Sequence, residues 1–183
     1  MALHDETSLL DEGDKAALEK MSDETEALRV WSSNWQNLVN TGSETVLVIK
    51  DNRVIVLNLM CRYVRYGANP SDFVYLPGAI GGLTALRELK LMRCKKLKEL
   101  SPRIGELKAL TLLDLAGCSV LEKLPNEIGE LDALTTLNFL LPPYLTTASR
   151  LLARVAAPRT PRGENAELPF ITRVRATTRA TAP

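Results

Sequence analysis

Histidine is almost missing from this chain of 183 residues, which holds only His4. A catalytic triad that depends on histidine and a metal site with two histidine ligands are therefore not expected. The phosphate-binding pattern G-x-x-x-x-G-K-[ST] is also absent, since no lysine follows Gly81-Gly82 at the required position. These absences predict that the chain is not an enzyme and needs no cofactor, metal or small-molecule substrate.

Cysteine is scarce as well, with Cys61, Cys94 and Cys118 alone. An odd count without paired spacing does not suit a disulfide framework. Long apolar runs are missing too, because none approaches the ~18–20 residues that cross a bilayer. The acidic start of the sequence lacks the apolar stretch of a secretory signal. The sequence therefore predicts a cytoplasmic protein with no membrane partner.

Charge of one sign is lacking overall, since the net charge is +1, which gives no global reason to expect nucleic acid. The two ends differ, however. Residues 1–28 hold nine acids, whereas residues 146–183 hold seven arginines. These arginines have no interleaved aromatic residues, so a solvated tail is favoured over nucleic-acid binding. Residues 1–12 and 157–183 are predicted as a disordered acidic end and a disordered basic tail.

A repeat of 24 residues is what the sequence does contain, over residues 76–145. The unit reads L-P-x-x-I-G-x-L-x-x-L-x-x-L-x-L-x-x-C-x-x-L-x-x. Its L-x-x-L-x-L part predicts a short strand with alternate residues pointing inward. The L-P-x-x-I-G part predicts a return by a short helix or 3₁₀ turn, and a buried cysteine thiol between the two parts is expected to bond a neighbouring carbonyl. Equivalent positions include Leu76, Leu100 and Leu124; Ile80, Ile104 and Ile128; Leu89, Leu113 and Leu137; and Cys94, Cys118 and Pro142.

Residues 76–145 resemble leucine-rich repeats of the intracellular, cysteine-containing type. Such repeats occur in plant disease-resistance proteins, Ras-group-related repeat proteins and ROCO-type GTPases. The resemblance implies an α/β fold, a short leucine-rich-repeat solenoid with a parallel concave sheet. Two amphipathic helices are the alternative, but they do not explain why Ile-Gly and Cys return in register.

Residues 13–59 are predicted to form an N-terminal cap and a degenerate first repeat strand. A helix over 13–30 is expected, with Asp14 as its N-cap, followed by Trp31 and Trp35 as cap core. Its apolar face would hold Ala16, Ala17, Leu18, Met21 and Leu28.

Two strands around a turn at 50–53 predict a hairpin over 43–59. Val54, Leu57 and Leu59 repeat the spacing of Leu86, Leu89 and Leu91, at a distance of 32 residues. An insertion at 60–75 accounts for the extra length. At the other end, Pro142 and Pro143 interrupt the repeat, and residues 146–156 are predicted as a C-terminal cap helix.

The candidate binding site comprises the residues between the inward leucines, which should form a grid on the concave face. They are Glu88, Lys90, Met92, Leu112, Asp114, Ala116, Thr136, Asn138 and Leu140. Exposed apolar members of such a grid are typical of a protein interface, although a short solenoid also exposes such residues simply because a cap is missing. The basic group Arg93, Lys95, Lys96 and Lys98 suits an acidic partner, although a solvated loop is its ordinary interpretation.

These patterns predict a protein-binding module that acts as a recognition or scaffold element in intracellular signalling. One alternative is a regulatory fragment of a multidomain nucleotide-binding protein, of the ROCO or resistance type. Another is a degenerate gene product, because about three repeats are needed for stability and the last one here is damaged. The final strand, Leu137 to Phe139, is expected to be an exposed edge that pairs with another chain.

Overall fold

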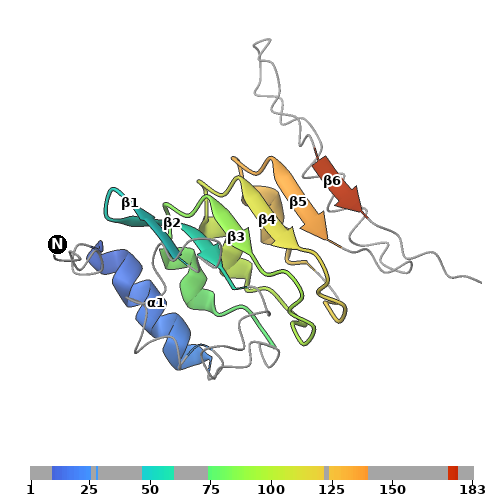
Figure 1. Ribbon diagram of the computed structural model, residues 1–183, viewed down its shortest axis with the longest axis horizontal. Coiled ribbons are helices and arrows are strands. Elements are labelled where there is room, and N and C mark those ends of the chain that lie inside the picture. The colour runs from blue at the N-terminus through green and yellow to red at the C-terminus, as the bar shows by residue number, and fades with distance from the viewer. Residues whose placement is uncertain are drawn as a thin grey trace, which may run out of the picture.

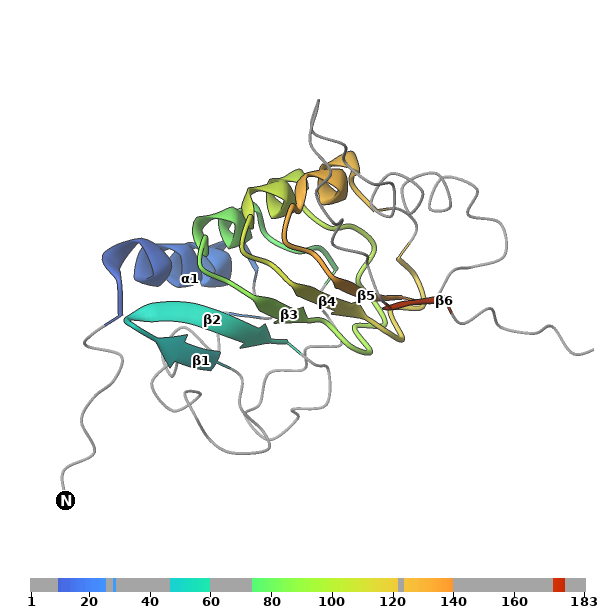
Figure 2. The same cartoon turned by 90° about the horizontal axis from the view of Figure 1, so that it is seen from above.

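The computed structural model describes residues 10–25, 28, 47–59, 74–121, 124–139 and 173–176. One six-stranded sheet runs through this part of the chain in the order β1-β2-β3-β4-β5-β6 (Figure 1). Seen from above, the helix α1 and three short turns form a row on one side of the sheet, and the strands form the other side (Figure 2). The fold is thus mixed α/β, as the sequence predicts.

Strands β1 (Leu47–Lys50) and β2 (Arg53–Asn58) form the predicted hairpin. Both residues of its turn are left-handed, with φ of 51° at Asp51 and 63° at Asn52. A two-residue turn of this kind matches the natural twist of a hairpin, and Asp and Asn tolerate the conformation better than most residues. The hairpin presents β2 as the first strand of the solenoid.

The parallel strands β3 (Glu88–Lys90), β4 (Leu112–Leu115) and β5 (Thr136–Phe139) follow β2 in the sheet. The register aligns Leu57 with Leu89, and Leu113 with Leu137. All four leucines are fully buried, at 0% exposure. The offset of 32 residues at the first step confirms that residues 54–59 are a first repeat strand.

Short 3₁₀ helices return the chain on the other side: η6 (Gly78–Gly82), η7 (Pro102–Glu106) and η8 (Asn126–Glu130). Each places one isoleucine of the repeat in the core, as predicted. Ser101 stands where the other two repeats have proline, and its Oγ accepts a hydrogen bond of 3.2 Å from the N–H of Arg103. The substitution therefore preserves the start of the turn by capping it.

The repeat glycines Gly81, Gly105 and Gly129 lie in these turns. A Cβ built on Gly105 would lie 2.8 Å from the Cβ of Glu127, and one on Gly81 would lie 3.0 Å from the carbonyl oxygen of Arg103. Each of these two glycines thus allows the next turn to pack closely. Of the described residues, none comes within 4 Å of a Cβ built on Gly129.

The thiols of Cys94 and Cys118 are buried between neighbouring coils. The Sγ of Cys94 donates to the carbonyl oxygen of Leu59 at 3.4 Å, and that of Cys118 donates to Leu91 at 3.1 Å. Both acceptors lie in the preceding coil. This confirms the predicted role of the thiol as a small buried group that satisfies a carbonyl.

Helix α1 (Glu12–Glu24) packs against η6 and covers the first coil. It is shorter than the predicted span of 13–30, and its N-cap is Asp11 rather than Asp14. The Oδ1 of Asp11 accepts from the N–H groups of Gly13 and Asp14. The prediction failed because Asp14 is engaged elsewhere, as described next.

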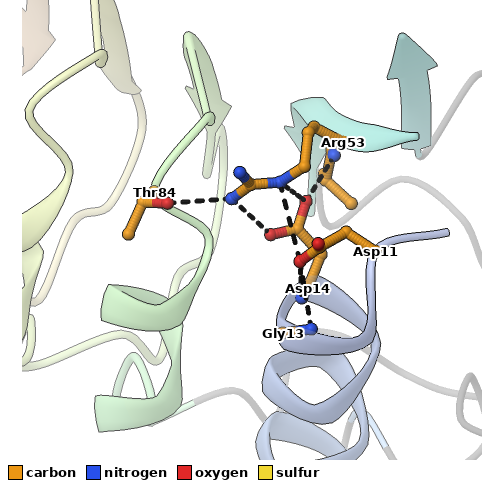
Figure 3. A network of polar contacts seen from close by, with 6 residues as sticks. Asp11, Gly13, Asp14, Arg53 and Thr84 are labelled. Atoms are coloured by element: carbon orange, nitrogen blue, oxygen red, sulfur yellow. Dashed lines mark hydrogen bonds and ion pairs between the residues drawn. The ribbon is translucent and has the colours of Figure 1, made fainter. Parts of the chain in front are cut away.

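Asp14 is completely buried and links α1 to the hairpin (Figure 3). Its carboxylate accepts from the Arg53 Nη2 and Nε at 2.9 and 3.1 Å, and from the N–H of Val54 at 2.7 Å. Arg53 Nη2 also donates to Thr84 Oγ1 at 2.8 Å, and the bond to Asp14 raises the arginine pKa. One arginine thus joins the helix, the hairpin and the first complete coil.

The remaining cap predictions are partly testable. Ala17, Leu18, Met21 and Leu28 are buried as expected, whereas Ala16 is exposed. Trp31 and Trp35, most of the insertion at 60–75, and the predicted cap helix at 146–156 lie outside the described residues, as do positions 140–145 of the repeat region.

The C-terminal edge differs from the expectation in two ways. Residues Arg173–Ala176, within the range predicted as a disordered tail, form strand β6. This strand pairs in parallel with β5, so the chain itself occupies the edge that was expected to be exposed. An open edge offers unpaired N–H and C=O groups, and any extended segment within reach pairs with them through its backbone.

Candidate interaction surface

The predicted grid lies on the open face of the sheet, which we define by its eight described residues. They are Glu88, Lys90, Met92, Leu112, Asp114, Ala116, Thr136 and Asn138. They alternate with the buried leucines because successive side chains of a strand point to opposite faces. Leu140, the ninth candidate, lies outside the described residues.

Two rows of this face follow from the strand register. Glu88, Leu112 and Thr136 are aligned in one row, and Lys90, Asp114 and Asn138 in the next. Neighbours within a row are separated by the strand spacing of ~4.8 Å. All six are half-buried, and α1 and the three turns all lie on the opposite side of the sheet (Figure 2).

The charges of the first row are already paired. Lys90 Nζ lies 2.8 Å from Glu88 Oε2, with about a third of each side chain exposed. An exposed pair of this kind contributes ~0–1 kcal/mol to stability. Its main effect is to hold both side chains in fixed positions along the strand.

Asp114 is held by neighbours in its own coil and the next. Its Oδ1 accepts from the N–H of Ala116 at 2.9 Å, and its Oδ2 accepts from Asn138 Nδ2 at 3.2 Å. The sequence reasoning missed this contact, although the separation of 24 residues places the two side chains in adjacent coils. The second row is therefore a connected polar surface rather than a set of independent charges.

Met92, Leu112 and Ala116 are half-buried members of the open face. The large hydrophobic side chains that are most exposed in the described chain lie elsewhere, at Val74, Tyr75 and Val120. The apolar part of the grid is thus modest, and polar contacts dominate its chemistry.

A separate set of polar contacts lies on the convex side. Arg103 donates to Glu106 at 2.8 and 3.0 Å, and this bond lowers the pKa of the Glu106 carboxyl below its ordinary value of 4.5. Lys108 Nζ donates to the carbonyl oxygen of Glu130 at 2.9 Å, which joins the second turn to the third. These exposed pairs face solvent, so they offer a matched reference for charges on the open face.

Metal and membrane features were sought in the same ranges. Within the residues that the structure describes, no group of histidine, cysteine, aspartate and glutamate is arranged to hold a metal ion. Over those same residues, no helix has both the length and the apolar character that a membrane crossing requires.

Protein-family models and curated proteins gave no match to this chain, whereas solved structures did. A leucine-rich-repeat protein of Leptospira interrogans is 30% identical with a TM-score of 0.36, over 45% of this chain and 20% of its own length. The described chain is a leucine-rich-repeat solenoid. That statement rests on its in-register coils, because TM-scores this low carry no argument by themselves.

Two plant ectodomains also resemble the chain. The leucine-rich-repeat ectodomain of the receptor kinase SOBIR1 from Arabidopsis thaliana is 19% identical, with a TM-score of 0.34, over 76% of this chain and 88% of its own. That of the membrane receptor kinase GASSHO1/SCHENGEN3 from the same plant was solved in complex with CASPARIAN STRIP INTEGRITY FACTOR 2. It is 16% identical, with a TM-score of 0.25, over 78% of this chain and 26% of its own.

Proposed function

We propose that this chain is a protein-binding module whose open face contacts the partner. The observation that carries the proposal is the in-register grid of half-buried polar and apolar side chains over three adjacent coils. A repeat fold presents such a face on a rigid scaffold, because each strand is fixed by the strands beside it.

The paired charges favour binding for an energetic reason. Ordering a long side chain at an interface costs about 0.5–1.5 kcal/mol. Glu88 and Lys90 hold each other in place, and Asp114 is held by Ala116 and Asn138. Part of this ordering is therefore complete before a partner arrives, so the open face is preorganised.

The finer proposal is a recognition or scaffold role in cytoplasmic signalling. It is supported by the resemblance of the repeat to the intracellular, cysteine-containing type and by two free, buried thiols. Free thiols persist in a reducing compartment. Catalysis has no part in the proposal.

The experiment is affinity capture from a cell extract, followed by titration calorimetry with each captured protein. The test variant is Glu88→Ala/Lys90→Ala/Asp114→Asn, in which asparagine keeps an acceptor for the N–H of Ala116. The control variant, Glu106→Ala/Lys108→Ala/Glu130→Gln, removes the same number of charges of each sign from the convex side. Both variants are first checked for unchanged urea unfolding.

The expected result is a partner that binds the wild type and the control variant but not the open-face variant. Equal binding to all three proteins would place the contact elsewhere and overturn the proposal. A wild-type chain without a cooperative unfolding transition would instead favour a degenerate gene product.

A further inference from the structure

A cluster of cations lies where the chain leaves β3, at one edge of the solenoid. Four exposed basic residues fall within six positions; we call them the basic edge, and they are Arg93, Lys95, Lys96 and Lys98. They follow the open face along the chain but share no residue with it. An inference about this edge is therefore independent of the open-face proposal.

The next coil shows that the fold does not need these cations. At the equivalent positions, 24 residues later, it has Gly117, Ser119, Val120 and Glu122. The backbone and the core are nevertheless repeated, since Cys94 and Cys118 make equivalent bonds to the preceding coil. Positions that differ between two coils of the same structure carry something other than the structure itself.

Arg93 strengthens this argument through its backbone. Its φ is 61°, a left-handed value that is unfavourable for a residue with a Cβ, whereas Gly117 adopts the same region at no such cost. The N–H of Arg93 donates to the carbonyl oxygen of Ala116 at 2.7 Å, which holds the conformation. Residues kept in strained conformations cluster at functional sites.

Most other cations on the described coils are paired, but these are not. Arg53, Lys90, Arg103 and Lys108 each form an ion pair. Among the ion pairs between described residues, none involves Arg93, Lys95 or Lys98. Three positive charges are thus available at one edge without an acidic neighbour.

Exposed apolar side chains gather at the same edge. The large hydrophobic residues most exposed in the described chain are Val74, Tyr75 and Val120, at 40, 47 and 41%. The carbonyl oxygen of Val74 accepts from the N–H of Lys98 at 2.8 Å, and Tyr75 bridges to Glu99. Val120 occupies in the next coil the position of Lys96. Cations and aliphatic groups therefore alternate from coil to coil, about 4.8 Å apart.

We propose that the basic edge binds an extended acidic segment of a partner protein in which aliphatic side chains alternate with carboxylates. The carboxylates would pair with Arg93, Lys95 and Lys98, and the aliphatic groups would cover Val74 and Val120. A protein segment is favoured over nucleic acid because single strands need aromatic surfaces on which bases stack. Tyr75 is the one aromatic residue here, and its hydroxyl donates to the carbonyl oxygen of Glu24.

The test is fluorescence anisotropy with the full chain and a labelled octapeptide of alternating glutamate and leucine. The edge variant is Arg93→Gly/Lys95→Ser/Lys98→Gln, whose first two changes copy the next coil and so suit the fold. The control variant, Lys15→Gln/Lys20→Gln/Lys50→Gln, removes three exposed cations from α1 and β1. Urea unfolding confirms that both variants are folded.

The wild type should bind this peptide, and affinity should fall about ten-fold in the edge variant but less than about two-fold in the control. Val74→Ser/Val120→Ser should weaken binding of the glutamate–leucine peptide but not of a glutamate–serine peptide. Failure of the wild type to bind, or equal losses in the edge and control variants, would overturn the proposal. Tighter binding of an oligoribonucleotide or of phosphatidylserine vesicles would overturn it in favour of that ligand.

Discussion

The two ends of the solenoid are closed by different kinds of interaction. At the N-terminal end, α1 packs on η6, and Asp14 binds Arg53 and the N–H of Val54 inside the structure. At the C-terminal end, β6 pairs with β5 through the backbone. The first closure depends on particular side chains, whereas the second uses groups that almost any extended segment provides. The N-terminal end should therefore be more sensitive to single substitutions.

The largest expected effect comes from Asp14→Ala. It leaves Arg53 and the buried N–H of Val54 without their acceptor, so the free energy of unfolding should fall by about 3 kcal/mol. Asp11→Ala removes only the N-cap and should cost about 1 kcal/mol. Urea denaturation of both variants measures the difference, and equal losses would show that the buried carboxylate is not what secures this end.

Gly105→Ala and Gly129→Ala compare the interior of the stack with its last described turn. The first change brings a Cβ within 2.9 Å of a backbone oxygen of Glu127 and should cost about 1–3 kcal/mol. The second meets no described neighbour and should alter the unfolding free energy by less than about 1 kcal/mol. Thermal and urea unfolding would test this order, and a reversed order would mean that the last turn is packed as tightly as the interior.

Removal of residues 173–183 tests the C-terminal end. The loss of β6 should lower the unfolding free energy by less than about 1 kcal/mol, because closing the connection of 33 residues between β5 and β6 offsets much of the gain from pairing. The freed edge should instead cause self-association that increases with concentration. Sedimentation velocity would detect it. A chain ending at residue 177, which keeps β6, is the control and should remain unassociated at the same concentrations.

The smallest effect is expected between the two ends, at Arg103→Gln. Glu106 has a pKa below 4.5 because of Arg103, so the pair stabilises the fold at neutral pH and this contribution disappears as the pH falls through the lowered pKa. The stability difference between wild type and variant should thus be small at pH 7 and vanish in acid. Unfolding curves from pH 7 to pH 3 would show it, and a difference that grew in acid would contradict the pairing.

The regular part of the fold could be predicted because the period is local. The spacing of Leu57, Leu89, Leu113 and Leu137 was enough to place the strands and their register, including the longer first step. The return by 3₁₀ turns and the inward thiols followed from the same unit. Each of these features repeats, so several coils report on it together.

The unpredicted features are those that occur once. Asp14 and Arg53 lie 39 positions apart with no period between them, and only the packing of α1 brings them together. The pairing of Glu88 with Lys90 had a signal, since residues two apart share a face of a strand, as did that of Asp114 with Asn138. Strand β6 had none, because the sequence of Arg173–Ala176 lacks the apolar pattern that marks the other parallel strands.

The two buried thiols have a consequence for how opening of the molecule can be followed. Cys94 and Cys118 occupy the same position in successive coils and are at most 5% exposed, so an alkylating reagent reaches either sulfur only when its coil separates from the one before. They form a natural pair of clocks, 24 residues apart. Equal labelling rates would mean that the coils open together, and faster labelling of Cys118 would mean that the solenoid frays from the end that backbone pairing alone closes.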